Sequence, residues 1–312
     1  MNLFPEITPH KTHILQVDDI HKIYIEQSGQ PDGIPVIFLH GGPGAGISPK
    51  YRQFFDPKIY NIILFDQRGS GKSTPYGSTV RNTTQNLIDD IKKIMDFLSV
   101  PKAIIYGGSW GSTLGLLFAQ AHPNLVISLV LRGIFLCRKS DIKWFYQHGA
   151  HQIYPDYWNT FIEGIPIEER YDLLSAFHKR IHDKDEKISH KYSKLWAEWE
   201  GRSSSLKLSS YVVNQFSDVS ISLAKMETHY FINNCFIKEN QIIDNIEKIS
   251  NIKCNIVHGR YDIVCPYKQA YDLHQAYSSS KIHIIDDAGH SLLEPGIQEK
   301  ILQIFSKPDE IT

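Results

Sequence analysis

The chain lacks the features that would mark a secreted, membrane-spanning or nucleic-acid-binding protein. It has four cysteines in 312 residues and no C-x-x-C pair, so a disulfide framework is not expected. The first residues, MNLFPEITPHKTH, contain no basic start followed by an apolar run, as a secretory signal would. The longest apolar runs, such as LVISLVL, are too short to cross a bilayer. The formal net charge of −1 gives no attraction to nucleic acid or to an anionic membrane. We therefore expect a reduced, cytoplasmic protein that binds neither.

Short β-rich runs alternate with helical patterns toward both ends of the chain. The runs PVIFLH, NIILF, AIIYG and VISLVLRG are typical of buried strands, and KCNIVHG and KIHIID repeat this pattern after residue 250. Between them, NTTQNLIDDIKKIMDFLSV predicts a helix, with Asn82 and Gln85 at capping-box spacing. This alternation favours an α/β protein with a mostly parallel sheet and helices on both faces.

The middle of the chain has a different character. It is rich in Trp, Tyr and His, carries helical stretches such as IEERYDLLSAFHKRIH and shows no series of strands. A helical insertion between two halves of one sheet accounts for this pattern better than a second independent domain does. We predict a core domain formed by residues 1–134 and 245–312, and a helical cap domain formed by residues 135–244.

The stretch DQRGSGKST resembles the end of a phosphate-binding loop. A P-loop has the pattern G-x-x-x-x-G-K-[ST], which requires a glycine at position 66, and this chain has Asp66 there. No strong helical pattern begins directly after Thr74. We therefore expect a structural loop after the strand NIILF and no bound nucleotide.

The stretch GGSWGS contains the pattern G-x-S-x-G, with Ser109 at its centre. It follows the expected strand AIIYG and precedes the helical pattern STLGLLFAQAH, which is the setting of a nucleophile elbow. The glycines permit a strained turn that lifts the Ser109 hydroxyl out of the sheet. Free N–H groups at the helix start would then stabilise a developing oxyanion. Ser109 is therefore the predicted nucleophile.

Two further elements fit the same chemistry. The loop HGGPG follows the strand PVIFL, where the Gly42 N–H is our candidate oxyanion donor beside the Trp110 N–H. Asp262 follows the strand KCNIVHG, and His290 follows KIHIID. The order serine, aspartate, histidine is the one expected for this kind of fold. His290 would accept the proton of the serine, and Asp262 would orient the imidazole.

Other acids and histidines compete for these roles. Asp286 and Asp287 lie close to His290 in the sequence, but their place at a strand end favours solvated or capping side chains. His148 and His151 have H-x-x-H spacing, yet no H-E-x-x-H motif or further ligand set accompanies them, so we expect no metal.

Taken together, these motifs resemble the prolyl aminopeptidases (proline iminopeptidases) of the α/β-hydrolase fold. HGGPGAG, DQRGSGKSTP, GGSWGSTL, LRGIFL, WAEWEG, ETHYF, GRYDIVCP and AGHS occur in this order along nearly the whole chain. The resemblance implies a serine peptidase that removes an N-terminal proline from peptides without metal or organic cofactor. It also implies that Ser109, Asp262 and His290 form the triad, with Gly42 and Trp110 at the oxyanion hole.

The resemblance further implies an amine-binding site in the inserted segment. Glu200 of WEG and Glu227 of ETHYF fall on acidic residues that hold the α-ammonium of the substrate. A buried carboxylate pair without a cationic partner is costly, and a free N-terminus supplies that partner. Aromatic residues, with Phe135 the best candidate, would line a small apolar pocket for the pyrrolidine ring.

Three further positions follow from the resemblance. Arg132 of LRGIF is expected to support the acidic cluster, and Cys265 falls where the family has a cysteine near the site. Phe145 stands where a tyrosine is expected in close relatives, which leaves the triad untouched but removes one polar contact with the substrate.

We read the chain as a serine exopeptidase whose partners are peptides with a free N-terminal proline. The core motifs alone also permit a general esterase or amidase that acts on small acyl substrates. A non-catalytic binding protein with the same fold is a third interpretation, which fluorophosphonate labelling of Ser109 would exclude. The sequence leaves the oligomeric state open, a homo-oligomer included, because the cap aromatics can pack internally or against a second copy.

Overall fold

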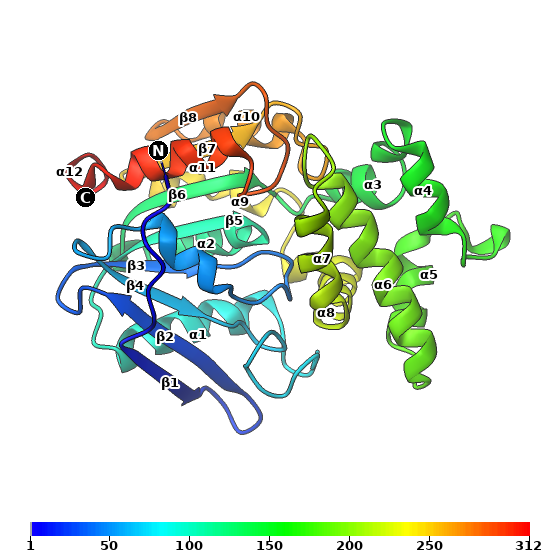
Figure 1. Ribbon diagram of the computed structural model, residues 1–312, viewed down its shortest axis with the longest axis horizontal. Coiled ribbons are helices and arrows are strands. Elements are labelled where there is room, and N and C mark those ends of the chain that lie inside the picture. The colour runs from blue at the N-terminus through cyan, green and yellow to red at the C-terminus, as the bar shows by residue number, and fades with distance from the viewer. Residues whose placement is uncertain (1) are drawn as a thin grey trace.

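The computed structural model describes residues 2–312 and is built around one eight-stranded sheet (Figure 1). The strand order is β1-β2-β4-β3-β5-β6-β7-β8, with β1–β2 and β2–β4 antiparallel and every other pair parallel. This mostly parallel arrangement confirms the predicted α/β class. The strands are β1 (Lys11–Gln16), β2 (Lys22–Gly29), β3 (Ile34–Leu39), β4 (Tyr60–Phe65), β5 (Ala103–Ser109), β6 (Val126–Ile134), β7 (Lys253–Gly259) and β8 (Ser280–Ile285).

Helices cover both faces of the sheet. One face packs against α1, α2 and α10, and the other packs against α11. The apolar residues of α1 recur at helical spacing, so one side of the helix is buried and the other is charged. These four helices are α1 (Thr84–Phe97), α2 (Trp110–Ala121), α10 (Tyr267–Ala276) and α11 (Pro295–Phe305), and α12 (Pro308–Ile311) follows them.

Between β6 and β7 the chain is helical. The helices α3–α8 of this segment lie beside the core on its right in Figure 1 and are here called the cap helices. The division into a core domain and a cap domain of residues 135–244 stays our proposal. The helices between the two strands are α3 (Lys139–Tyr146), α4 (Pro155–Ile162), α5 (Leu173–Ile181), α6 (Glu186–Ser203), α7 (Ser210–Asp218), α8 (Ser220–Ile232) and α9 (Gln241–Asp244).

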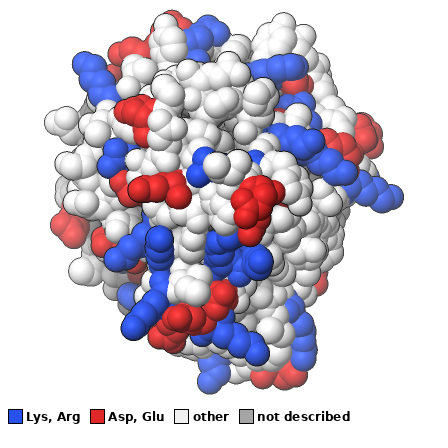
Figure 2. All heavy atoms as spheres, turned by 90° about the vertical axis from the view of Figure 1, so that its right-hand side faces the viewer, with Lys and Arg blue, Asp and Glu red and all other residues white. Residues whose placement is uncertain are grey.

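The outer face of the cap helices carries both signs of charge. In Figure 2, which looks onto this face, basic and acidic side chains are interspersed among uncharged ones. Such a mixed surface gives little long-range attraction to ligands of either sign. Across residues 2–312, we find no helix that is both long and apolar enough to cross a membrane.

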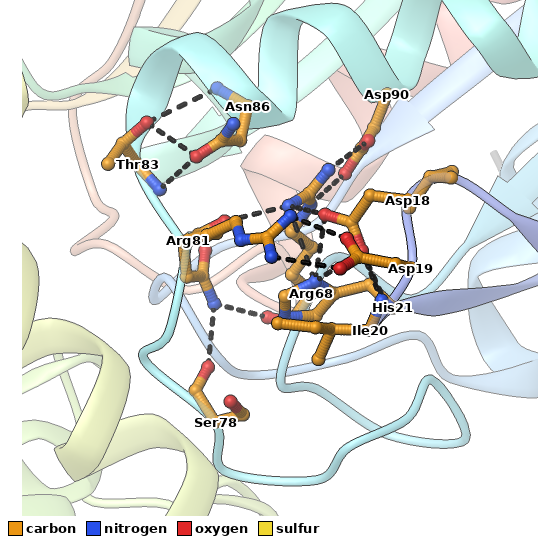
Figure 3. Close-up of polar contacts among 12 residues, drawn as sticks. Asp18, Asp19, Ile20, His21, Arg68, Ser78, Arg81, Thr83, Asn86 and Asp90 are labelled. Carbon is orange, nitrogen blue, oxygen red and sulfur yellow. Dashed lines mark hydrogen bonds and ion pairs between the residues drawn. The ribbon is translucent and has the colours of Figure 1, made fainter.

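The start of α1 differs from the capping box expected at Asn82 and Gln85. Thr83 is the N-cap, and its side chain accepts a hydrogen bond from the Asn86 N–H at the third helical position (Figure 3). Asn82 is used elsewhere, since its amide donates to the Arg68 carbonyl oxygen at 3.1 Å. Asn82, which local spacing favoured as the N-cap, therefore makes tertiary contacts instead.

The loop DQRGSGKST anchors a buried ion cluster (Figure 3). The Arg68 guanidinium donates to both carboxylate oxygens of Asp90, at 2.6 and 2.8 Å, and to Asp18 at 2.7 Å. It also donates to the Arg81 carbonyl oxygen at 2.7 Å. Arg68 thus ties the loop after β4 to α1 and to the β1–β2 connection, which is a structural role.

We expect Arg68→Met to destabilise the fold strongly, because removing one partner of a buried ion pair leaves charges without compensation, at a cost of about 3–5 kcal/mol. Urea unfolding measures this change in the free energy of unfolding. Arg81→Met is the matched control: its pair with Asp19 is 52 % and 70 % exposed. Exposed pairs contribute about 0–1 kcal/mol. Similar losses in the two variants would contradict a structural role specific to Arg68.

Candidate active site

Ser109 ends β5 in a backbone conformation that few residues adopt. Its φ is 57° and its ψ is −125°, and α2 begins at the next residue. The turn requires glycine on both sides of it. A Cβ on Gly107 would lie 2.2 Å from the Gly111 carbonyl oxygen, and a Cβ on Gly111 would lie 2.1 Å from that of Leu39. The predicted strand–turn–helix geometry of a nucleophile elbow is therefore present.

Asp262 and His290 are brought together from two loops that follow neighbouring strands. The Nδ1–H of His290 donates to Asp262 Oδ2 at 2.7 Å, and the Cys265 N–H donates to Asp262 Oδ1 at 2.8 Å. Burial alone would raise the pKa of Asp262, but the charge and hydrogen bond of His290 outweigh it, and the pKa is lowered. Asp262 is thus held ionised, as an orienting carboxylate must be.

Ser109 and His290 line one cavity of about 280 Å³. Within residues 2–312 the Ser109 hydroxyl has no hydrogen bond to His290, and Ser109 and Cys265 line one small recess. In many hydrolases the bond between nucleophile and base tightens only when the substrate is bound. The groups predicted as nucleophile, base and orienting acid therefore share one site, and their catalytic roles stay predictions.

The position of His290 is fixed from two sides. The Arg132 side chain donates to the His290 carbonyl oxygen at 2.6 Å, and the His290 N–H donates to the Ser204 carbonyl oxygen at 2.9 Å. Ser204 directly follows α6, so a cap helix holds the predicted base in place. Gly133 lies against the imidazole with φ of +54°, and a Cβ there would be 2.9 Å from His290 Cε1.

Arg132 lines the same cavity as Glu200 and Glu227. Among the described residues it forms no ion pair with either carboxylate, and its expected role as support for the acidic cluster stays a prediction. Its guanidinium lies over the backbone of Gly108 instead.

The predicted oxyanion donors lie beside Ser109. Trp110 is the first residue of α2, so its N–H has no acceptor within the helix. Gly42 lines the same cavity as Ser109, and its N–H has no hydrogen bond in the described chain. Gln67 of the DQRGSGKST loop connects the two segments that carry these donors. Its side-chain N–H donates to the His40 carbonyl oxygen at 2.9 Å, and its side-chain oxygen accepts from the Trp110 indole at 3.0 Å.

Glu200 and Glu227 meet beneath the cap helices. They are 5 % and 2 % exposed and come from α6 and α8, which pack against each other. Tyr146 donates to Glu200 Oε1 at 2.5 Å, and the Trp196 indole donates to Glu227 Oε2 at 2.6 Å. The two aromatic rings stack with centroids 4.2 Å apart.

The electrostatics of this pair are unfavourable for two negative charges. Burial raises the pKa of Glu200, although hydrogen bonds from Glu227 and Tyr146 oppose that shift. Burial and the neighbouring Glu200 raise the pKa of Glu227 well above its usual range. No Lys, Arg or His side chain pairs with either carboxylate anywhere in the described chain.

A small apolar recess connects Ser109 with this acidic pair. The predicted pocket residue Phe135 lines it, and so do Phe145, Cys265 and the acidic pair itself. Phe145 stacks on Trp199 with centroids 5.2 Å apart, and its backbone carbonyl accepts from the Trp199 indole. Burial raises the pKa of the Cys265 thiol well above its usual range, so the thiol is neutral beside Ser109.

Sequence reasoning missed three residues of the site: Gln67, Tyr146 and Trp196. Trp196 precedes Glu200 by four positions on α6, so helical spacing alone places the two on one face. Tyr146 neighbours Phe145, the position where a tyrosine was expected. The hydroxyl that contacts Glu200 belongs to Tyr146, one position after the expected tyrosine.

Comparison with known proteins gives consistent results. Residues 34–296 match the family model described as alpha/beta hydrolase fold. The chain is 47 % identical over 304 residues to the proline iminopeptidase of Arabidopsis thaliana, covering 96 % of this chain and 80 % of the plant protein. It is 42 % identical over 297 residues to that of Neisseria gonorrhoeae, covering 95 % of each chain.

Solved structures show the same fold. An esterase from Exiguobacterium antarcticum superposes with a TM-score of 0.69 at 21 % identity, covering 95 % of this chain and 98 % of the esterase. A proline iminopeptidase from Mycobacterium smegmatis superposes with a TM-score of 0.63 at 19 % identity, covering 96 % of this chain and 99 % of that protein. At these identities the likeness concerns the fold alone.

The contact between Gly133 and His290 yields a prediction. We expect Gly133→Ala to reduce kcat/KM for a simple aryl ester by about 100-fold, because the new Cβ pushes the imidazole out of position. Gly77→Ala is the matched control. Gly77 has a similar φ of +66°, but a Cβ there would meet only the flexible Lys225 side chain at 3.5 Å. Equal activity losses in the two variants would mean that backbone strain is responsible and not displacement of His290.

Proposed function

The chain belongs to the alpha/beta hydrolase family and, within it, to the proline iminopeptidases, and from this we propose that it releases N-terminal proline from peptides through an acyl-enzyme on Ser109. The observation that carries this proposal is the buried pair Glu200 and Glu227, which adjoins the elbow and pairs with no cationic side chain among residues 2–312. A substrate with a cationic N-terminus supplies that partner. A buried acidic pair would not help a hydrolase to bind neutral esters.

In the proposed reaction, His290 removes the hydroxyl proton of Ser109 as the serine attacks the prolyl carbonyl. Asp262 holds the imidazole through Nδ1 and stabilises its positive charge. The N–H groups of Gly42 and Trp110 receive the oxyanion. His290 then gives its proton to the leaving amine, and water hydrolyses the acyl-enzyme with the same groups.

The recess sets the selectivity in this scheme. Phe135 and Phe145 supply apolar surface for the pyrrolidine ring, and the acidic pair holds its nitrogen. An acylated N-terminus carries no charge and would leave the carboxylates without a partner. An internal peptide bond would in addition need space beyond the pair, where Tyr146 and Trp196 stack. Free N-terminal prolyl peptides are therefore the proposed substrates.

The remaining properties are proposals on the same basis. The scheme uses only side chains and backbone of this chain, so we propose that the enzyme acts without metal or organic cofactor. We propose a cytoplasmic enzyme that has no nucleic-acid, nucleotide or membrane partner and whose active site lies between a core domain and a cap domain of residues 135–244.

Neutralising the acidic pair tests the proposal. We expect Glu227→Gln and Glu200→Gln each to lower kcat/KM for prolyl arylamide by at least about 100-fold, since a charge-assisted contact to the substrate nitrogen is lost. Hydrolysis of an uncharged aryl ester should change only a few-fold.

Glu198→Gln is the matched control on α6, because Glu198 pairs with Arg202 at the protein surface. It should leave both activities unchanged. Equal losses on arylamide and ester in the Glu200 and Glu227 variants would refute ammonium recognition and favour a general esterase.

A further inference from the structure

A second buried histidine contacts the loop that carries Asp262. His258 is the last residue but one of β7, and it is 0 % exposed. We propose that His258 is a positioning residue for the reaction, which fixes the loop of Asp262 and thereby aligns this carboxylate with His290. This inference rests on the proposed function and deepens it, because it adds a residue to the predicted machinery and leaves the substrate and the reaction unchanged.

The hydrogen bonds of His258 determine which ring nitrogen carries hydrogen. The Ile134 N–H donates to Nδ1 at 3.1 Å, so Nδ1 carries none. Nε2 lies 2.8 Å from the Cys265 carbonyl oxygen, which can only accept, so Nε2 carries the hydrogen. The ring is therefore neutral, with its one acceptor and its one donor both in use. A charged ring would place a second donor against the Ile134 N–H.

The contact with Ile134 anchors the ring where two strands of the sheet separate. β6 and β7 are paired as far as Arg132 and Val257. The next residue of β6, Gly133, has φ of +54°, and the N–H of Ile134 after it donates to the imidazole. Because a buried backbone N–H needs an acceptor, His258 supplies the one that the β7 backbone no longer provides.

The donor side of the ring acts on the loop of Asp262. The same Cys265 whose carbonyl oxygen accepts from His258 donates its N–H to Asp262 Oδ1 at 2.8 Å. The other carboxylate oxygen, Oδ2, accepts from His290 Nδ1 at 2.7 Å. Loss of the His258 donor would leave the buried Cys265 carbonyl without this partner. Cys265 could then shift, and the Asp262 carboxylate would shift with it.

His258 also lies close to the carboxylate itself. Its Nε2 is 3.5 Å from Asp262 Oδ2, and both side chains are 0 % exposed. In buried surroundings a nearby N–H dipole favours the ionised form of the carboxyl group. A Lys or Arg in this place would instead cancel much of the negative charge that Asp262 presents to the protonated base. A neutral donor leaves that charge available to His290.

Two substitutions separate the two sides of the ring. The side-chain oxygen of Asn can take the place of Nδ1, and the side-chain nitrogen of Gln can take that of Nε2. His258→Asn therefore keeps the acceptor for Ile134 and loses the donor to Cys265. We expect it to lower kcat for an uncharged aryl ester by about tenfold, with KM changed less than about twofold. His258→Gln, which keeps the donor, should retain kcat within about threefold.

Fluorophosphonate titration of Ser109 counts the active sites, so that kcat refers to folded enzyme only. His21→Asn is the matched control. His21 is also 0 % exposed, and its Nδ1 lies 3.0 Å from an oxygen of Asp18, beside Arg68 (Figure 3). This substitution can lower stability, but kcat for each titrated site should equal that of the wild type.

The hydrogen bond between His290 and Asp262 gives a readout that a mere loss of stability would not change. A hydrogen that an imidazole donates to a buried carboxylate resonates far downfield in ¹H NMR spectra, because the bond is short and charge-assisted. In folded His258→Asn we expect this resonance to move upfield, since the misaligned carboxylate accepts less well. In His258→Gln and His21→Asn it should stay at the wild-type position.

These outcomes decide the inference. Equal losses of kcat in both His258 variants, or an unmoved resonance in His258→Asn, would overturn it. The wild-type ring is a further test that depends on no variant: ¹⁵N NMR of histidine-labelled protein at about pH 7.5 should show hydrogen on Nε2 of His258 and none on Nδ1, and any other state would contradict the inference. A wild-type enzyme that hydrolyses the aryl ester but no prolyl arylamide would instead remove the proposed function.

Discussion

Two carboxylates that are buried together and pair with no cationic side chain among residues 2–312 are the constraint on which the rest of the site depends. Placing Glu200 and Glu227 beneath the cap helices costs folding free energy, because both are removed from water and repel each other. Only a shared proton or a bound cation relieves that cost. The empty site is therefore unfavourable when both carboxylates are charged. Because a bound amine removes this free-energy cost, the site favours a substrate with a free amine.

Selectivity further requires that this pair stay at a fixed distance from Ser109, and the contacts between cap helices and core provide it. The carbonyl oxygen of Ser204, directly after α6, accepts from the His290 N–H. Ser222 on α8 donates to the Gly44 carbonyl oxygen at 2.8 Å, within the loop that carries the oxyanion donor. The two helices that hold the acidic pair thus also contact the base and the oxyanion loop.

The sequence predicts well what depends on local geometry. Ser109 is recognisable because strand, turn and helix follow one another directly, and most core strands are recognisable from their apolar runs. The edge strand β1 was missed because its residues are largely exposed, and Arg132 and the Tyr146–Glu200 contact depend on packing between distant segments. Such contacts join residues 54 or more positions apart, which no local pattern encodes.

The cost of the acidic pair is measured most directly by thermal unfolding of the wild type and Glu227→Gln as a function of pH. The native pKa of Glu227 is raised above its usual 4.5, so the native state holds a proton that the unfolded state has lost. Stability then falls as pH rises from that value through the native pKa. We predict that Glu227→Gln melts several degrees higher at about pH 8 and that the difference shrinks toward about pH 5. A variant that melts below the wild type at both values would contradict a costly buried charge.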